Sequence, residues 1–416
     1  MTTTTTSSSI FSSAPRIPPD AIFALTAEYI ADPSPQKVNL GQGTYRDDKG
    51  QPWVLPSVRE SRRIIEERGL LHEYLPILGL KTFREKTAEL VFGEGYGKIQ
   101  DKLATSQTLS GTGSLHLAGS IIKSCLLRSH PSHPLPTVYI PNPTWSNHHL
   151  VFSSLGFNTL SFPYYNPTTK SLNIPSYLST LRAAALGSII ILHACAHNPT
   201  GLDPSPEEWK EIGGIVKERN LFPLFDAAYL GFNSGDYDKD AWPVRYFVSE
   251  LGVESAVCLS FAKNMGLYGE RVGCLLLCTS TPEIATNTQS VLESLQRSEI
   301  SNPPAFGAKI AETILANEKL RRLWFEDLRT MSGRIQEMRR VLFEGLGRYS
   351  SGNWDHLIRQ SGMFGFLGLS RDIVRILKDE YHIYMAENSR VSIAGLNSGN
   401  VDYVARSIAE VLAREQ

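Results

Sequence analysis

The sequence predicts an α/β protein in which helices connect parallel strands. Residues 188–193, SIIILH, form an uncharged run with the length and composition of a buried strand. Residues 205–208, SPEE, form a capping box with proline at the first helical position, which predicts a helix to about residue 219. Residues 221–226 are a second apolar run. These three segments predict a strand–helix–strand unit with parallel strands and a right-handed crossover.

The composition limits the size and class of the molecule. With 416 residues the chain can hold two domains with ample cores, and 42% hydrophobic and 20% charged residues are ordinary for a soluble enzyme. A net charge of −1 gives no reason to expect nucleic acid or an anionic membrane as a partner, and no apolar run is long enough to span a membrane. The five cysteines form no CxxC pair, and most lie in apolar runs, so we expect buried thiols in a reducing compartment.

The N-terminal region predicts a flexible tail followed by a short helix and a turn. Residues 1–16 are rich in Thr and Ser but contain a single arginine, which favours a tail over an arginine-rich mitochondrial presequence and hence a cytoplasmic location. Residues 23–31 predict a helix. Residues 38–43, VNLGQG, predict a strand that meets a Gly-x-Gly turn, where the backbone at Gly43 can approach a ligand closely.

A second glycine-rich turn, SGTGS at residues 110–114, precedes a helical apolar pattern from Leu115 to Cys125. A helix N-terminus presents free N–H groups and a positive dipole end, which together bind phosphate. The hydroxyls of Ser110 and Thr112 can add further donors. The turn matches neither GxGxxG nor GxxxxGK[ST], so the nucleotide-binding fingerprints do not fit it.

Further polar and aromatic residues follow predicted strands. Trp145 follows the strand at residues 137–140, where a ring can stack on a ligand. Asn198 and Asp226 both follow parallel strands, at the edge where open α/β sheets bind ligands. His193 and His197 are four residues apart but not on a helix, and no third ligand is placed, so we expect no metal.

Residues 260–273, SFAKNMGLYGERVG, lie between two uncharged apolar runs that predict buried strands. Lys263 would therefore lie at the end of the sheet, in a cleft where low dielectric lowers the pKa of its amine and makes it a nucleophile. Arg271 offers a guanidinium suited to phosphate. A nucleophilic lysine, a nearby serine (Ser260) and such an arginine are what pyridoxal 5'-phosphate (PLP) requires. A lone Lys–Arg pair in a loop is more commonly a solvated surface, so this interpretation depends on the rest of the chain.

The C-terminal part predicts a smaller α/β unit. Residues 317–349 form one long charged helix that would link it to the larger unit. Two strands at 362–369 and 390–396 would be covered by helices at 370–380 and 401–414. We therefore expect a flexible tail at 1–16, an N-terminal segment at 17–48 that packs with the small domain, a large domain at 49–325 and a small domain at 326–416.

Taken together, these motifs resemble those of aspartate aminotransferases, which belong to the class I PLP-dependent aminotransferases. The resemblance runs from about residue 17 to the C-terminus and includes the lysine segment at 260–273, CAHNPTG at 195–201, DAAY at 226–229 and SNPP at 301–304 with Arg297 four residues before its serine. It implies fold type I of the PLP-dependent transferases, with a mostly parallel, seven-stranded-type sheet in the large domain and a smaller α/β domain.

The resemblance also implies how the cofactor would be held. Lys263 would bind PLP covalently, and Asp226, backed by His148, would keep the pyridine nitrogen protonated. Asn198 and Tyr229 would donate to the phenolic oxygen. The ring would stack on Trp145. The phosphate would be bound by Ser110, Gly111, Thr112, Ser260, Arg271 and, from the other subunit of a homodimer, Tyr74.

For the substrate, the resemblance implies transamination between L-aspartate and 2-oxoglutarate. Arg390 would bind the α-carboxylate, and Lys263 would move the proton. The remaining substrate contacts would come from Gly43, Trp145, Asn198 and, from the other subunit, Arg297. Three positions depart from the pattern: Gln42 replaces a small apolar residue, Ala262 a hydroxyl residue and Ile300 an aromatic residue.

Other functions stay open at this stage. An aminotransferase of this fold could act on a related amino acid in a specialised biosynthetic pathway. A PLP-dependent lyase or decarboxylase shares the fold and would differ in not needing 2-oxoglutarate for turnover. A non-enzymatic relative would be expected to lose Lys263 or Asp226, and both are present. A nicotinamide oxidoreductase would need a GxGxxG fingerprint, and the sequence has none.

Overall fold

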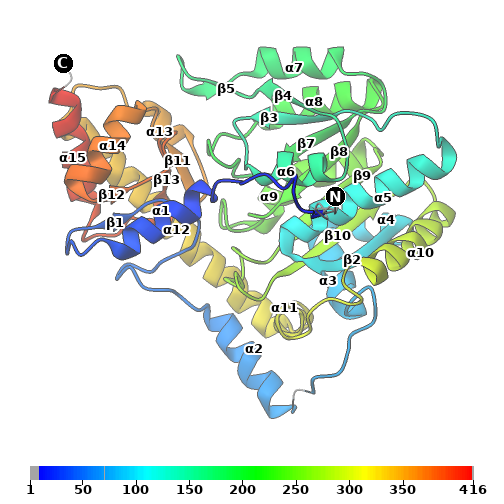
Figure 1. Cartoon of the computed structure of the whole chain (residues 1–416). Coiled ribbons are helices and arrows are strands. Elements are labelled where there is room, and N and C mark those ends of the chain that lie inside the picture. Colours follow the sequence, from blue (N-terminus) through cyan, green and yellow to red (C-terminus); the bar gives the residue numbers. More distant parts are fainter. Residues whose placement is uncertain (1–8, 70, 415–416) are drawn as a thin grey trace, which may run out of the picture.

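A seven-stranded sheet forms the centre of the larger unit (Figure 1). The computed structural model describes residues 9–69 and 71–414. The strand order is β2-β10-β9-β8-β7-β3-β4, and β10 runs antiparallel to both of its neighbours whereas the other paired strands are parallel. The predicted α/β class with a mostly parallel sheet is thus confirmed. The strands are β2 (Leu103–Leu109), β3 (Val138–Asn142), β4 (Thr159–Pro163), β7 (Ile189–His193), β8 (Phe222–Ala227), β9 (Ser255–Ser260) and β10 (Val272–Cys278).

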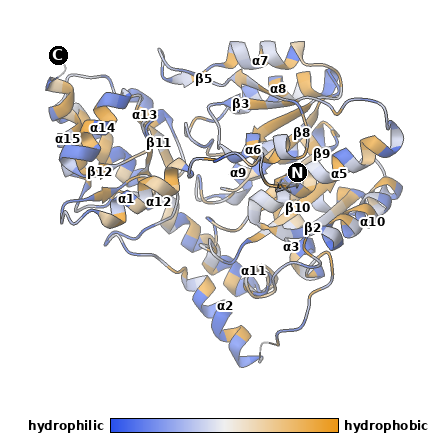
Figure 2. Ribbon diagram, in the orientation of Figure 1, coloured by the Kyte–Doolittle hydropathy of each residue, from blue (hydrophilic) through white to orange (hydrophobic). Residues whose placement is uncertain are grey.

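The central strands are buried on both faces, which explains their uncharged sequences. In β7, Ile189 and Ile191 join one hydrophobic core, and Ile190 and Leu192 join the other. Successive side chains of a strand point to opposite faces, so one short run supplies both cores. Figure 2 shows this as apolar colour along the strands and polar colour on the outer surfaces of the helices.

Helices cover each face of the sheet. One core includes residues of α5 (Ser110–Ser129), α6 (Asn147–Ser154) and α10 (Pro282–Glu299). The other core includes residues of α2 (Pro56–Glu67), α3 (Lys81–Phe92), α7 (Ile174–Ala183), α8 (Pro206–Glu218), α9 (Tyr237–Arg245) and α11 (Phe306–Ala316). The predicted capping box is present, since Ser205 Oγ accepts from Glu208 N–H and the Glu208 carboxylate accepts from Ser205 N–H. The short elements α4 (Tyr96–Ile99), β5 (Tyr165–Asn166) and β6 (Ser171–Leu172) lie outside this framework.

The long helix α12 (Glu318–Tyr349) runs from beside the sheet into a smaller unit (Figure 1). There β11 (Phe364–Phe366) pairs antiparallel with β13 (Arg390–Ser392), and α13 (Asp355–Arg359), α14 (Arg371–Tyr381) and α15 (Val401–Arg414) pack around them. The helices and strands predicted here from the sequence are confirmed, although both strands are shorter than expected. The four domain limits given above stay a prediction.

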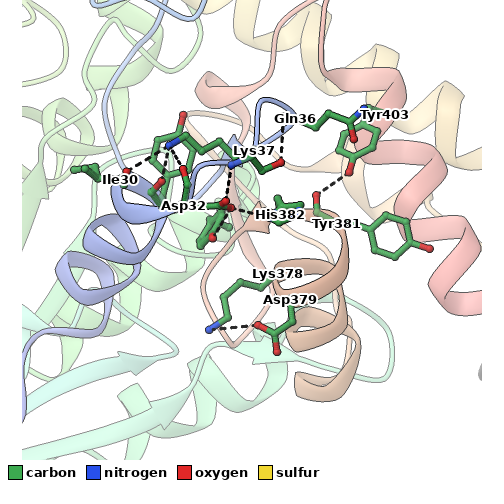
Figure 3. Close-up of polar contacts among 12 residues, drawn as sticks. Ile30, Asp32, Gln36, Lys37, Lys378, Asp379, Tyr381, His382 and Tyr403 are labelled. Carbon is green, nitrogen blue, oxygen red and sulfur yellow. Dashed lines mark hydrogen bonds and ion pairs between the residues drawn. The ribbon is translucent and has the colours of Figure 1, made fainter.

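The start of the described chain joins this smaller unit. After α1 (Ala21–Ala31), the two residues of β1 (Val38–Asn39) pair in parallel with β12 (Ile383–Tyr384). The sequence predicted a strand that begins at residue 38, but neither β12 nor this pairing. At this junction Asp32 contacts residues of the smaller unit, whereas Lys37 binds carbonyls of its own N-terminal segment (Figure 3). Asp32 Oδ2 lies 2.7 Å from His382 Nδ1 and accepts from the Tyr384 hydroxyl at 2.8 Å, and Lys37 Nζ donates to the carbonyl of Tyr29 at 3.0 Å.

One expectation about the cysteines is wrong. Cys195, Cys258, Cys274 and Cys278 are buried as expected, but Cys125 is exposed because it lies on the outer side of α5. Leu127, two residues further on, is exposed as well, so apolar residues near the end of α5 are not all covered. None of the helices in the described ranges is both long and apolar enough to cross a membrane.

Candidate active site

The carboxyl ends of five strands bring the predicted residues to one edge of the sheet. β2, β3, β7, β8 and β9 are mutually parallel, so their carboxyl ends share an edge. Asp226 lies within β8, one residue before its end, rather than beyond it as expected. The other residues at this edge follow directly from the strand ends: Ser110 after β2, Trp145 after β3, Asn198 after β7, Tyr229 after β8 and Lys263 after β9.

Lys263 has the electrostatic surroundings of a nucleophilic amine. Burial lowers the pKa of its amine to about 8, and the positive charges of Arg271 and Arg390 act in the same direction, against the opposing charge of Asp226. The ring of Tyr268 lies against the amine, with its centroid 5.6 Å from Nζ. A pKa near 8 leaves part of the amine unprotonated at neutral pH, which a lysine nucleophile requires.

Asp226 is a buried carboxylate that stays ionised. Burial alone would raise the pKa of its carboxyl group, but the hydrogen bond from His148 and the charges of His148, His193 and Lys263 outweigh burial and lower this pKa. His148 Nε2 lies 3.0 Å from Asp226 Oδ2. An ionised carboxylate at the end of a sheet can hold a positively charged ring nitrogen.

A chain of hydrogen bonds behind Asp226 fixes the orientation of His148. The backbone N–H of Asn198 donates to His193 Nδ1 at 3.5 Å, and His193 Nε2 lies 3.1 Å from Thr144 Oγ1. Thr144 Oγ1 in turn lies 2.8 Å from His148 Nδ1. If each group in this chain donates to the next, His148 carries its proton on Nε2 and donates it to Asp226. Sequence reasoning did not find the roles of Thr144 and His193, because no local pattern shows that the two loops meet.

The phosphate-binding residues predicted from the sequence form a cradle at the N-terminus of α5. Ser110 Oγ lies 2.8 Å from Ser260 Oγ, and the backbone N–H of Ser110 donates to the carbonyl of Arg271 at 3.1 Å. Ser110 and Arg271 both have positive φ angles, 59° and 54°, which side-chain-bearing residues rarely adopt and which cluster at functional sites. Thr112 follows on the first turn, where its hydroxyl accepts from Asn147 Nδ2 at 3.3 Å. Gly111 lies between them, and a Cβ there would lie 3.4 Å from Ser260 Cβ.

Arg390 is a buried cation with unused hydrogen-bonding capacity. Its Nη2 donates to the carbonyl of Gly41 at 2.6 Å, and its guanidinium lies 4.4 Å from the ring centroid of Phe364. Its Nε is buried and has no hydrogen-bond partner in the described part of the chain. Leaving a buried charged donor unpaired is costly, so this arrangement favours binding of an anion such as a carboxylate. Gly43 lies beside it: a Cβ on Gly43 would come 3.0 Å from Phe364 Cζ.

Tyr229 also contacts Phe364: its ring lies edge-on to the Phe364 ring at a centroid distance of 6.5 Å. Burial raises the pKa of its phenol, so the hydroxyl stays protonated and can donate a hydrogen bond. Trp145 is half-buried and packs edge-on against His148, with ring centroids 5.6 Å apart.

Tyr74 and Arg297 lie apart from these residues within the chain. They line an open hollow together with Ser301 and Asn302. Tyr74 is 88% exposed, and Arg297 is exposed on α10, where it donates to the Ser301 hydroxyl. Arg297 makes no ion pair with a carboxylate in the described ranges of the chain. One chain therefore presents these two residues outward rather than toward Lys263.

Few polar contacts surround the residues at the three positions where the sequence departs from the family pattern. Gln42 is half-buried, and its Oε1 accepts from Arg46 Nη2 at 3.5 Å. Ala262 contributes its backbone N–H to Ser260 Oγ at 3.2 Å. Ile300 is half-buried after α10. No group of three or more potential metal ligands is found among residues 9–69 and 71–414.

Comparisons with known proteins agree with this geometry. A family model described as "Aminotransferase class I and II" matches residues 35–408. The chain is 45% identical over 396 residues to a mitochondrial aspartate aminotransferase of Dictyostelium discoideum, and the alignment covers 95% of this chain and 91% of that relative. It superposes on the aspartate aminotransferase from Saccharomyces cerevisiae cytoplasm with a TM-score of 0.92, 42% identity and coverage of 98% and 99%. The aromatic-amino-acid aminotransferase of Burkholderia pseudomallei, covalently bound to pyridoxal phosphate, gives a TM-score of 0.92 at 35% identity with coverage of 97% and 100%.

Proposed function

Because the chain belongs to the class I and II aminotransferases, we propose that it transfers the amino group of L-aspartate to 2-oxoglutarate, producing oxaloacetate and L-glutamate. It is a PLP-dependent enzyme of fold type I. The observation that carries the assignment of an amino acid as substrate is Arg390, a buried guanidinium with an unpaired Nε whose charge acts on the amine of Lys263. A guanidinium in that position fits the α-carboxylate of an amino acid.

The residues at the sheet edge fit PLP. Lys263 supplies an amine whose pKa is lowered to about 8, and Asp226 supplies a buried, ionised carboxylate for the ring nitrogen. The N-terminus of α5 and Arg271 would bind the phosphate, and Asn198 and Tyr229 would donate to the phenolic oxygen. Trp145 would stack on the ring. The sheet edge thus provides complementary groups for the aldehyde, the ring and the phosphate.

PLP, when bound, supplies an electron sink that allows a proton to leave the α-carbon of an amino acid. The amine of Lys263, freed when the amino group of the substrate takes its place, would take up that proton and return it. The Asp226 carboxylate would pair with the protonated ring nitrogen, and His148 Nε2, 3.0 Å from Asp226 Oδ2, would hold the carboxylate in place. Arg390 would bind the carboxylate of the substrate and so fix how the substrate lies at the site.

We further propose that the enzyme is a homodimer whose sites are shared between subunits. The support is the position of Tyr74 and Arg297, which are exposed together in a hollow away from Lys263 of their own chain. In a two-fold dimer each such pair would complete the site of the other subunit. Arg297 would then bind the second carboxylate of aspartate or glutamate, and Tyr74 would reach the cofactor phosphate.

Subunit exchange tests the shared site. Lys263→Ala is expected to be inactive, and Arg297→Ala is expected to lose roughly one to two decades of activity at subsaturating aspartate. In the mixed dimer one site combines Lys263 of one subunit with Arg297 of the other, so equal mixing should restore roughly a quarter of wild-type activity. No recovery after proven exchange, or a fully active monomer in sedimentation, would refute the shared site.

A screen of amino donors tests the reaction itself. The purified enzyme is mixed with single amino acids, and the loss of the visible absorption of bound PLP is followed without and with 2-oxoglutarate. We expect the largest kcat/KM for aspartate and glutamate and a strict need for a 2-oxo acid. Turnover that needs no 2-oxo acid would indicate a lyase or decarboxylase instead.

A second candidate is transamination of a related amino acid in a specialised biosynthetic pathway. The half-buried Gln42, between Gly41 and Gly43, favours it, because a polar side chain there can change which acid is accepted. A preferred donor other than aspartate or glutamate in the same screen would support this candidate. For the location we propose the cytoplasm, as for the yeast structure above; the Dictyostelium relative is named mitochondrial, and subcellular fractionation decides between them.

A further inference from the structure

Tyr268 lies in the turn that follows Lys263 and contacts three parts of the site. Its ring centroid is 5.6 Å from Lys263 Nζ. Its backbone carbonyl accepts from Arg271 Nη1 at 3.0 Å. Its hydroxyl oxygen accepts from the backbone N–H of Tyr45 at 2.8 Å. The last contact joins the lysine turn to a segment more than two hundred residues earlier in the chain.

Tyr45 belongs to the segment that supports Arg390. Two residues of this segment, β1, pair with β12 of the smaller unit. The carbonyl of Leu40 accepts from Ser392 N–H at 2.7 Å, and the carbonyl of Gly41 accepts from Arg390 Nη2 at 2.6 Å. The Tyr268 hydroxyl therefore connects the nucleophile's turn to the segment that holds the carboxylate-binding arginine.

We propose that Tyr268 is a positioning residue with two separable tasks. Its ring holds the side chain of Lys263 through a cation–π contact, and its hydroxyl sets the position of the Gly41–Arg390 pair relative to the lysine turn. The proposal rests on the proposed function, since it assigns a role in binding the substrate carboxylate and in placing the cofactor-binding lysine. It goes beyond that function because Tyr268 itself need not touch cofactor or substrate.

The two tasks have different physical signatures. A ring face attracts positive charge, so the ring favours the protonated form of the nitrogen that it faces. The hydrogen bond from the Tyr45 N–H to the Tyr268 hydroxyl is neutral and joins two segments of the chain. Its loss should change the position of Arg390 and hence the affinity for the substrate. The task of the ring is therefore measured by the pH midpoint of protonation, and the task of the hydroxyl by KM.

Tyr268→Phe isolates the hydroxyl, because it keeps the ring. We expect KM for aspartate and 2-oxoglutarate to rise about two- to tenfold with a smaller change in kcat, which is the range for losing one hydrogen bond. The pH midpoint of the visible absorption of the PLP-loaded enzyme should stay at the wild-type value. Tyr403→Phe is the matched control: its hydroxyl donates to the carbonyl of Tyr381 at 2.8 Å within the smaller unit (Figure 3). That variant should change neither quantity.

Tyr268→Leu and Tyr268→Met remove the ring as well. We expect both to raise KM as Tyr268→Phe does and to move the absorption midpoint to lower pH by about half a unit or more, because the neutral form is no longer disfavoured. The two side chains differ in shape and flexibility, so agreement between them separates loss of the ring from a packing effect. If one of them does not fold, the other still gives the midpoint.

Three outcomes decide the proposal. A Tyr268→Phe variant with the KM of Tyr403→Phe would overturn the task of the hydroxyl. A midpoint in the ring-free variants equal to that of the wild type would overturn the task of the ring. A wild-type chain that binds no PLP would instead refute the proposed function, and this outcome is distinguishable because the wild type is measured first.

Discussion

The two arginines proposed for the substrate carboxylates lie in very different surroundings. Arg390 is buried at the start of β13, where the Gly41 carbonyl and the Phe364 ring hold its guanidinium. Arg297 is exposed on α10 beside Tyr74, with the Ser301 hydroxyl as its contact. A single chain thus prepares one end of the site completely and leaves the other end open. The difference fits the proposal that one chain supplies the group for the α-carboxylate, whereas the group for a second carboxylate comes from the other subunit.

The largest expected effect concerns the end of the site that lies within one chain, where Arg390 and Lys263 are found. Lys263→Ala should abolish the visible absorption of the bound cofactor and nearly all transamination, because the variant lacks the amine that would bind the cofactor. The measurements are the absorption spectrum and the single-turnover rate with aspartate. A reducible lysine adduct that persisted in the peptide around residue 263 of this variant would contradict the assignment.

Asp226→Ala should retain the fold and cofactor binding but lose activity on the order of 10²–10³-fold or more. Without the carboxylate the ring nitrogen loses its proton, and a neutral ring is a weak electron sink. Circular dichroism serves as the control for folding, and kcat with bound cofactor is the measured quantity. Asp226→Asn should be similarly impaired, whereas turnover near the wild-type value in either variant would exclude this role.

The two arginines themselves give the sharpest test of the comparison. Arg297→Ala should lower kcat/KM for aspartate by roughly one to two decades, the cost of about 1–3 kcal/mol for a lost charged hydrogen bond, and leave alanine and phenylalanine little changed. Arg390→Ala should lower kcat/KM for all three amino acids, since each has an α-carboxylate. Preference for aspartate that survives in Arg297→Ala would refute the dicarboxylate assignment.

The smallest effect concerns the stability of the cofactor-free enzyme. The pKa of Lys263 in the folded state is about 8, below its ordinary value. Between this pKa and the ordinary value the unfolded state binds more protons than the folded state, so the lysine lowers the free energy of unfolding, and the full loss is present below pH 8. That cost fades as the pH rises from 8 toward 10. Lys263→Met should therefore stabilise the cofactor-free enzyme by about 1–2 kcal/mol at pH 7, a value reduced for partial solvent screening, and by less at pH 10. Thermal unfolding at the two pH values measures this difference, and an equal gain at both would contradict it.

The sequence predicted those features whose signals are local. β7 to β10 and α8 were found because uncharged runs and a capping box identify buried strands and a helix start without further information. Asn198 and Asp226 could be placed at one edge of the sheet because parallel strands bring their carboxyl ends together, and Lys263 at an end of the sheet because two uncharged runs flank its segment. The resemblance to a family then supplied roles for residues such as Arg390 that local patterns leave open.

The features that escaped prediction are contacts between distant segments. A strand was expected from residue 38, but β12 is only two residues long, too short to show a pattern, and its pairing with β1 spans more than 340 residues. The hydrogen bonds from Thr144 to His148 and His193 join two loops, and the bond from Tyr45 to Tyr268 joins two turns. None of these has a spacing that a single sequence could reveal, because each depends on how the finished fold brings loops together.

The pairing of β1 with β12 has a consequence for biosynthesis. The ribosome makes Val38 early but Ile383 almost last, so the first strand waits for nearly the entire chain before it can form its ladder. The large sheet can assemble in the meantime, since β2 to β10 are complete by Cys278. Contacts of such long sequence separation form slowly. The nascent polypeptide should therefore acquire its central sheet while still attached to the ribosome and fix Gly41 beside Arg390 only after release.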